Sequence, residues 1–124
     1  MLGSPLNMAP EVLSNVEYNS KADIWSIGTC FYELLFGRPP YTASNMIDLL
    51  KNIQKVPLSI IIFMQWIIEI DRNINKISEE AEDILRRMLV VDPNKRISWE
   101  ELFNHKINYY QEEKLKKELE KSLK

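Results

Sequence analysis

Cysteine, histidine and glycine are scarce in this 124-residue chain, and their scarcity excludes several kinds of site. Cys30 is the only cysteine, so no disulfide can form within the chain, and cysteine-rich zinc motifs are excluded. His105 is the only histidine, which excludes a metal site built from several histidines. The three glycines, at positions 3, 28 and 37, cannot form a G-x-G-x-x-G loop of the kind that cradles nucleotide phosphates.

A large excess of one charge and a long apolar run are absent too. Sixteen basic and eighteen acidic residues give a formal charge of -2, which does not favour nucleic acid or an anionic membrane as a partner. The longest apolar stretch, residues 58–70, is shorter than the ~20 residues of a membrane-spanning helix. The N-terminus lacks the pattern of a secretory signal. We therefore expect one globular domain in a reducing compartment, the cytoplasm, with no membrane span.

The strongest helix signal covers residues 21–36. Ser20 is a good N-cap, and Gly37 is a typical stop residue that two prolines soon follow. The segment is apolar on nearly all sides, which is typical of a buried central helix. Gly28 in its interior indicates that another backbone approaches closely. The residues expected in the core are Trp25, Ile27, Cys30, Phe31, Leu34 and Leu35.

Three more segments combine a capping residue with apolar residues at helical spacing. They predict helices from Ser44 to about Lys55, after Ser78, and after Ser98, where Glu101 completes the spacing of a capping box. Residues 92–94, Asp-Pro-Asn, are typical of a turn. No credible pair of strands is found, so the predicted fold class is mainly α.

Four short motifs stand at the joints between these segments. In chain order they are G-S-P-L-N-M-A-P-E at residues 3–11, D-I-W-S-I-G at 23–28, G-R-P-P-Y at 37–41 and L-V-V-D-P-N-K-R at 89–96. Together they resemble the C-terminal lobe of a eukaryotic serine/threonine protein kinase. The first motif and the segment 37–43 look most like the Unc-51-like, autophagy-initiating group.

The resemblance implies a helical C-terminal lobe that lacks the N-terminal lobe, the catalytic loop and the D-F-G segment. Residues 1–107 would be this partial kinase domain, and residues 108–124 would be a charged, helical tail. The resemblance itself covers residues 3–55 and 76–107, which leaves the apolar stretch between them without a counterpart.

The resemblance also implies a substrate loop made of Gly3, Ser4, Pro5 and Leu6. In the family this loop receives the protein substrate beside its phosphorylated serine or threonine. Ser4 matches a hydroxyl that helps to organise the catalytic groups, or it is merely a loop hydroxyl. Asn7 departs from the pattern, because an aromatic residue usually precedes M-A-P-E, and this puts the packing beneath the loop in doubt.

Two structural roles come with the same resemblance. Glu11 would pair with Arg96, and Asp23 and Trp25 would anchor the catalytic loop. A buried carboxylate–guanidinium pair is bidentate, and loss of one partner costs ~3–5 kcal/mol. The alternative for Glu11 and Arg96 is a surface pair worth ~0–1 kcal/mol. The alternative for Asp23 is an acid in the first turn of a helix, where the helix dipole favours it.

Protein kinases transfer phosphate from ATP with the help of Mg²⁺, and the resemblance implies both for the full-length family member. The chain itself has no Gly-rich loop, no D-F-G and no H-R-D sequence, so no cofactor is expected in it. We expect the 124 residues alone not to transfer phosphate. A non-catalytic interaction module and a degenerate copy remain as alternatives. The degenerate copy would fold poorly, because core surface around Trp25 and Ile27 would be exposed.

Two segments are candidate partner surfaces. Leu58–Ile70 is apolar and β-prone and would leave an exposed apolar patch, unless it is sequence foreign to the mature protein, such as an unremoved intron. The tail, residues 111–124, predicts a solvated helix with Leu115, Leu119 and Leu123 along one side.

Overall fold

The computed structural model describes residues 5–63 and 77–123, and these residues form helices and no strand, as the sequence predicted. Residues 58–63 are helical. The remaining elements, in chain order, are η1 (Pro5–Asn7), α1 (Pro10–Leu13), α2 (Lys21–Phe36), α3 (Met46–Lys55), α5 (Glu79–Met88), α6 (Trp99–Phe103), η2 (Lys106–Tyr109) and α7 (Tyr110–Ser122).

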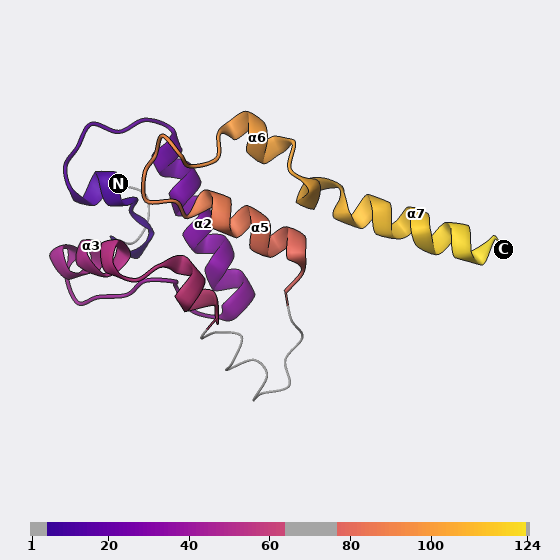
Figure 1. The fold of residues 1–124 in the computed structure, drawn as a ribbon, viewed down its shortest axis with the longest axis horizontal. Coiled ribbons are helices and arrows are strands. Elements are labelled where there is room, and N and C mark those ends of the chain that lie inside the picture. Colours follow the sequence, from indigo (N-terminus) through magenta and orange to yellow (C-terminus); the bar gives the residue numbers. More distant parts are fainter. Residues whose placement is uncertain (1–4, 64–76, 124) are drawn as a thin grey trace.

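Helix α2 is the centre of the fold. In Figure 1 it stands in the middle of the molecule, α5 crosses it, and α3 lies to one side. Its predicted bounds are confirmed, and Gly37 ends it in the left-handed conformation with φ of 83°. The predicted cap is wrong, because the Ser20 side chain makes no capping hydrogen bond. The side chain of Asn19 accepts from the Lys21 amide instead, at 2.9 Å.

One face of α2 is buried and another is exposed, which corrects the predicted core. Trp25 is fully buried, whereas Leu34 is 84% exposed, Ile27 is 44% exposed and Cys30 is exposed. Positions 27, 30 and 34 lie on one side of a helix, and none of the described elements covers that side. Trp25 is therefore not exposed as the degenerate-copy alternative expected, whereas Ile27 is exposed and was wrongly placed in the core.

Gly28 lets α5 approach α2 closely. A Cβ atom at this position would lie 3.0 Å from Leu89 Cδ2 and 3.0 Å from Met88 Cβ. The sequence indicated that another backbone approaches Gly28, but the nearest atoms are side-chain atoms at the end of α5. Leu85 of α5 is buried in the cluster that includes Trp25, whereas Ile84 and Met88 are buried in a second cluster with Ile24.

We expect Gly28→Ala to destabilise the chain by up to about 2 kcal/mol. The substitution gains up to ~1 kcal/mol of helix propensity, but overpacking a tight core costs ~1–3 kcal/mol. Urea unfolding measures the difference, and Cys30→Ala on the exposed face of the same helix serves as the control, with an expected change within about 0.5 kcal/mol. A Gly28→Ala variant more stable than the parent would contradict the close approach.

The other predicted helix starts are mostly confirmed. Ser78 accepts a hydrogen bond from the Ala81 amide at 3.1 Å, and Ser98 with Glu101 forms the predicted capping box. At α3 the cap is Asn45 and not Ser44, since the Asn45 side chain accepts from the Asp48 amide at 2.8 Å. Helix α3 therefore begins at Met46.

The first part of the apolar stretch is helical, so its predicted β character is wrong for residues 58–63. Ile62 is fully buried, and Leu58 and Ile61 pack against the main core. Ile60 and Phe63 are 50% and 60% exposed. Residues 64–70 of the stretch lie outside the described part of the chain.

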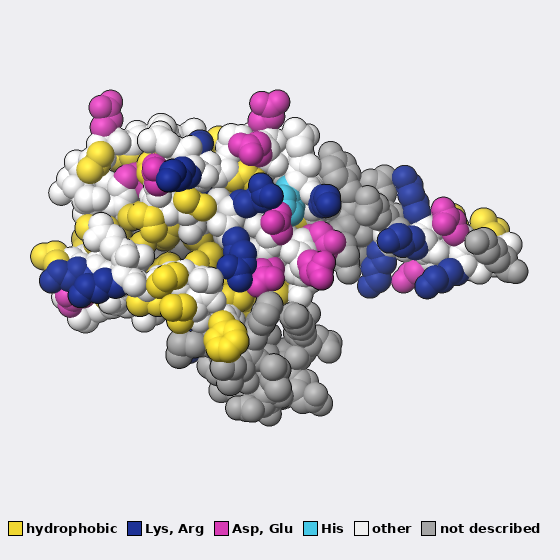
Figure 2. Space-filling view, in the orientation of Figure 1, with side chains coloured by type: hydrophobic (Ala, Val, Ile, Leu, Met, Phe, Trp, Pro, Cys, Tyr) yellow, Lys and Arg dark blue, Asp and Glu magenta, His cyan; other side chains and the backbone are white. Residues whose placement is uncertain are grey.

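Helix α7 extends away from the rest of the molecule (Figure 1). In Figure 2 basic and acidic side chains cover much of its visible surface, whereas apolar side chains gather over the body of the fold. Leu115, Leu119 and Leu123 on α7 are all more than half exposed. In the parts of the chain that the structure describes, no helix is both long enough and apolar enough to cross a bilayer.

Candidate functional site

The structure brings Glu11 and Arg96 together, although they are 85 positions apart in the sequence. Pro10 starts α1, a position that suits proline, and this places Glu11 in the first turn facing the interior. The Glu11 carboxylate accepts from both terminal nitrogens of Arg96, at 2.7 Å and 2.9 Å. The Arg96 side chain is fully buried and that of Glu11 is 7% exposed. This is a bidentate, buried ion pair, and not the surface pair that was the alternative.

Every N–H of the Arg96 guanidinium has an acceptor. Besides Glu11, Nη1 donates to the Lys21 carbonyl at 2.8 Å, Nε donates to the Val90 carbonyl at 2.9 Å, and Nη2 donates to the Val91 carbonyl at 3.3 Å. Lys21 Nζ in turn donates to the carbonyl of Arg96, at 2.8 Å. Arg96 therefore connects α1, the start of α2 and the segment after α5 in one network.

Trp25 completes the surroundings of Arg96. The guanidinium carbon lies 5.3 Å from the centre of the indole ring, within the range of a cation–π contact. The indole ring of Trp25 also stacks with the ring of Tyr41. Burial raises the pKa of Tyr41 to about 12, and its phenol hydroxyl donates to the Val56 carbonyl at 3.0 Å. Trp25 thus sits in the packed core between the ion pair and the entry to α3.

Asp23, the other predicted anchor, points elsewhere. It is exposed in the first turn of α2, and its carboxylate accepts no hydrogen bond from any described residue. Asp23 and Trp25 are two positions apart on a helix, so their side chains face different sides. The anchoring role of Asp23 stays a prediction, and its present setting is that of an acid near a helix N-terminus.

The predicted substrate loop is described from Pro5 onwards, and Gly3 and Ser4 lie outside the described residues. Pro5 and Leu6 belong to η1, which packs on α2. Together with residues 43–47 and Leu49 they line an open groove of about 600 Å³, which we call the loop groove. Met46 and Ile47 on its α3 side are 44% and 70% exposed. The loop groove therefore offers apolar side chains beside the loop.

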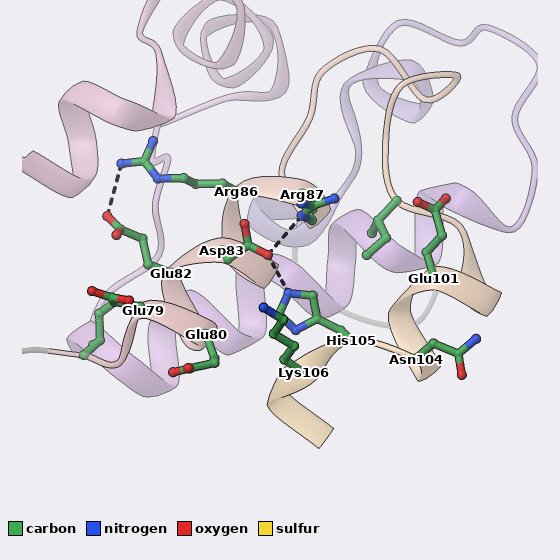
Figure 3. Close-up of a pocket in the computed structure, with 12 residues that line it drawn as sticks. Glu79, Glu80, Glu82, Asp83, Arg86, Arg87, Glu101, Asn104, His105 and Lys106 are labelled. Carbon is green, nitrogen blue, oxygen red and sulfur yellow. Dashed lines mark hydrogen bonds and ion pairs between the residues drawn. The ribbon is translucent and has the colours of Figure 1, made fainter. Parts of the chain in front are cut away.

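A second cleft, of about 890 Å³, lies between α5 and the segment from α6 to η2. Figure 3 shows Asp83 between His105 and Arg87, with which it makes hydrogen bonds of 2.6 Å and 3.0 Å. The Ile107 amide donates to His105 Nδ1 at 3.1 Å, so in the neutral ring the proton sits on Nε2 and is donated to Asp83. This contact joins residues 22 positions apart and was not predicted.

The Asp83 contact links stability to pH. The hydrogen bond from His105 lowers the pKa of the Asp83 carboxyl below its ordinary value, and Arg87 acts in the same direction. A lowered pKa in the folded chain favours folding above the ordinary pKa of aspartate. That contribution is lost as pH falls through the lowered pKa. It is small, because the Asp83 side chain is 49% exposed and solvent screens the charges.

The described side chains do not offer a site for a metal ion. Among the side chains that the structure describes, those of 5–63, 77–108 and 114–123, no group of three or more His, Cys, Asp or Glu could hold a metal. In the second cleft Asp83 is paired with Arg87 and His105, and Glu82 is paired with Arg86.

The fold and the site together are those of the C-terminal lobe of a protein kinase. Helix α2 lies at the centre, the acidic residue of α1 pairs with a buried arginine after α5, and a loop packs on α2. The model of the protein kinase domain matches residues 1–107. The chain belongs to this family.

Curated relatives agree with this assignment. The serine/threonine-protein kinase apg-1 of Neurospora crassa is 41% identical over 107 residues, which are 86% of this chain and 10% of that protein. The serine/threonine-protein kinase ATG1 of Candida glabrata is 39% identical over 86% of this chain and 10% of its own length. The serine/threonine-protein kinase atg1 of Dictyostelium discoideum is 38% identical over 84% of this chain and 14% of its own length. These relatives confirm the predicted autophagy-initiating group. The chain spans about a tenth of their length.

Proposed function

We propose that these residues are the substrate-facing and core part of a serine/threonine protein kinase, an enzyme that uses ATP and Mg²⁺ to phosphorylate protein serine or threonine in the cytoplasm. One observation carries the proposal: the Glu11–Arg96 pair ties the M-A-P-E motif to the L-V-V-D-P-N-K-R motif with every guanidinium donor used. The kinase relatives support it.

The exposed face of α2 supports a larger kinase around this segment. Ile27 and Leu34 are 44% and 84% exposed on the central helix of the fold. Apolar side chains on a core helix favour a covering element, and a catalytic segment of the same enzyme is the cover we propose. Residues 1–107 would then be part of the kinase domain and residues 108–124 a helical tail that follows it.

The role we propose for this segment is to hold the protein substrate. Pro5 and Leu6 with Gly3 and Ser4 form the substrate loop, and the loop groove beside it favours an apolar side chain of the substrate. The 124 residues contribute no group that binds nucleotide phosphates or takes the proton of the substrate hydroxyl. On their own they therefore do not transfer phosphate.

A full-length read of the transcript, followed by an assay of the encoded protein, tests the proposal. We expect an open reading frame that continues upstream into catalytic-loop and D-F-G motifs, and a protein that incorporates radiolabelled phosphate into a serine peptide. An Arg96→Ala variant tests whether the buried pair is needed in that enzyme. An encoded protein that lacks both motifs would overturn the proposal and favour the non-catalytic module, which would share the loop groove. Phosphate transfer by the purified 124 residues would contradict their proposed role.

The two candidate partner surfaces remain predictions. Ile60 and Phe63 are exposed in the described part of Leu58–Ile70, and the three leucines of α7 are exposed in the tail.

A further inference from the structure

Asn7 is the residue at which the chain departs from the resemblance, and the structure shows what it contacts. It ends η1, directly after Pro5 and Leu6 of the substrate loop. The Ser26 hydroxyl of α2 donates to the Asn7 carbonyl at 2.7 Å, and the Thr29 hydroxyl donates to Asn7 Oδ1 at 3.0 Å. Two side chains of the central helix thus hold both the backbone and the side chain of Asn7.

These contacts are not those of a solvated loop. Thr29 is 1% exposed, and Asn7 and Ser26 are half-buried. Each hydroxyl also has a carbonyl of α2 within reach: Ser26 lies 3.3 Å from the Ala22 oxygen, and Thr29 lies 2.7 Å from the Ser26 oxygen. Each hydroxyl has a single proton, which it shares between Asn7 and the α2 carbonyl. Without Asn7 both hydroxyls would keep an acceptor, whereas without the Thr29 hydroxyl Asn7 Oδ1 would lose this donor. These hydrogen bonds therefore stabilise the position of the loop more than they stabilise α2.

We infer that Asn7 is a positioning residue that fixes the substrate loop on α2 by hydrogen bonds to Thr29 and Ser26. Because Leu6 immediately precedes Asn7, the same contacts set where Leu6 stands in the loop groove, opposite Met46 and Ile47. Asn7 is not a catalytic residue. Its effect on substrate binding rests on the proposed function, but its effect on the order of the loop does not.

Thr29 gives a sharp test, because valine copies its shape without the hydroxyl and serine keeps the hydroxyl. The readout is hydrogen exchange of the Met8 amide, which donates to the Pro5 carbonyl at 3.1 Å and reports on η1. We expect Thr29→Val to speed this exchange about 3- to 10-fold, Asn7→Ala to do the same, and Thr29→Ser to restore the parent rate. The Leu89 amide at the end of α5 serves as the internal control and should not change.

Unchanged Met8 exchange in both Thr29→Val and Asn7→Ala, with the Leu89 amide still protected, would overturn the inference. A second measurement separates it from the proposed function. Two synthetic peptides with a single serine, followed by leucine in one and alanine in the other, are titrated against the parent chain and the Thr29 variants. Weaker binding of the leucine peptide by Thr29→Val, restored by Thr29→Ser, supports both. No binding by the parent, together with the expected Met8 change, supports the positioning role and counts against the substrate role of the loop.

Discussion

Arg96→Lys is expected to lower the free energy of unfolding by about 2–5 kcal/mol, because lysine keeps the charge but has three donors for five buried hydrogen bonds, and each acceptor left without a donor costs about 1–3 kcal/mol. Lysine has three donors at a single point, and cannot reproduce the planar fork that reaches Glu11, Lys21, Val90 and Val91 together. Several buried carbonyls would lose a donor at the same time. Urea unfolding followed by circular dichroism measures the loss.

The matched control is Arg86→Lys, the same substitution in an exposed pair. Arg86 donates to Glu82 at 3.1 Å with its side chain 42% exposed, so the expected cost is about 1 kcal/mol or less. Glu11→Gln separates charge from shape, since it keeps an acceptor for one guanidinium nitrogen only; we expect it to be destabilising as well. If Arg96→Lys costs no more than Arg86→Lys, the buried network is not what holds α1 to the segment after α5.

Local signals in the sequence were sufficient for most of the helices. The bounds of α2, the caps at Ser78 and Ser98 and the stop at Gly37 depend on residues within a few positions, and the structure confirms them. The Glu11–Arg96 partnership came from the resemblance and not from any local pattern, because 85 positions separate the two residues. The structure then supplied what the resemblance did not, namely the acceptors of the other guanidinium donors.

The failures come from what local patterns leave undetermined. Apolar composition predicted burial for Cys30 and Leu34, yet burial needs a covering neighbour, and the described residues provide none on that face. The β-branched residues 60–62 favoured strand, but Ile62 packs against the core from a helix, so tertiary contacts override propensity there. The Asp83–His105 bond and the Asn7–Thr29 contact each join polar residues 22 positions apart, and polar residues carry no periodic signal.

Trp25→Ala is the second substitution with a large expected effect, a loss of about 3–5 kcal/mol in the free energy of unfolding. Trp25 is fully buried, stacks with Tyr41 at a ring distance of 6.2 Å and lies under Arg96. Removing the indole leaves a cavity next to the ion pair and takes away the cation–π contact. Trp99→Ala serves as the control: Trp99 is half-buried and contacts Phe103 at 6.0 Å, so we expect a smaller loss.

Trp25→Phe distinguishes packing from hydrogen bonding at the same position. Within the described residues the indole N–H of Trp25 is buried and has no hydrogen-bond partner. A buried donor without a partner costs free energy, so replacing the indole by a phenyl ring removes that penalty while keeping an aromatic ring beside Tyr41. We therefore expect Trp25→Phe to cost only about 1–2 kcal/mol. A loss as large as that of Trp25→Ala would mean that the N–H has a partner, and that the indole holds the core by its polar edge as well as by its area.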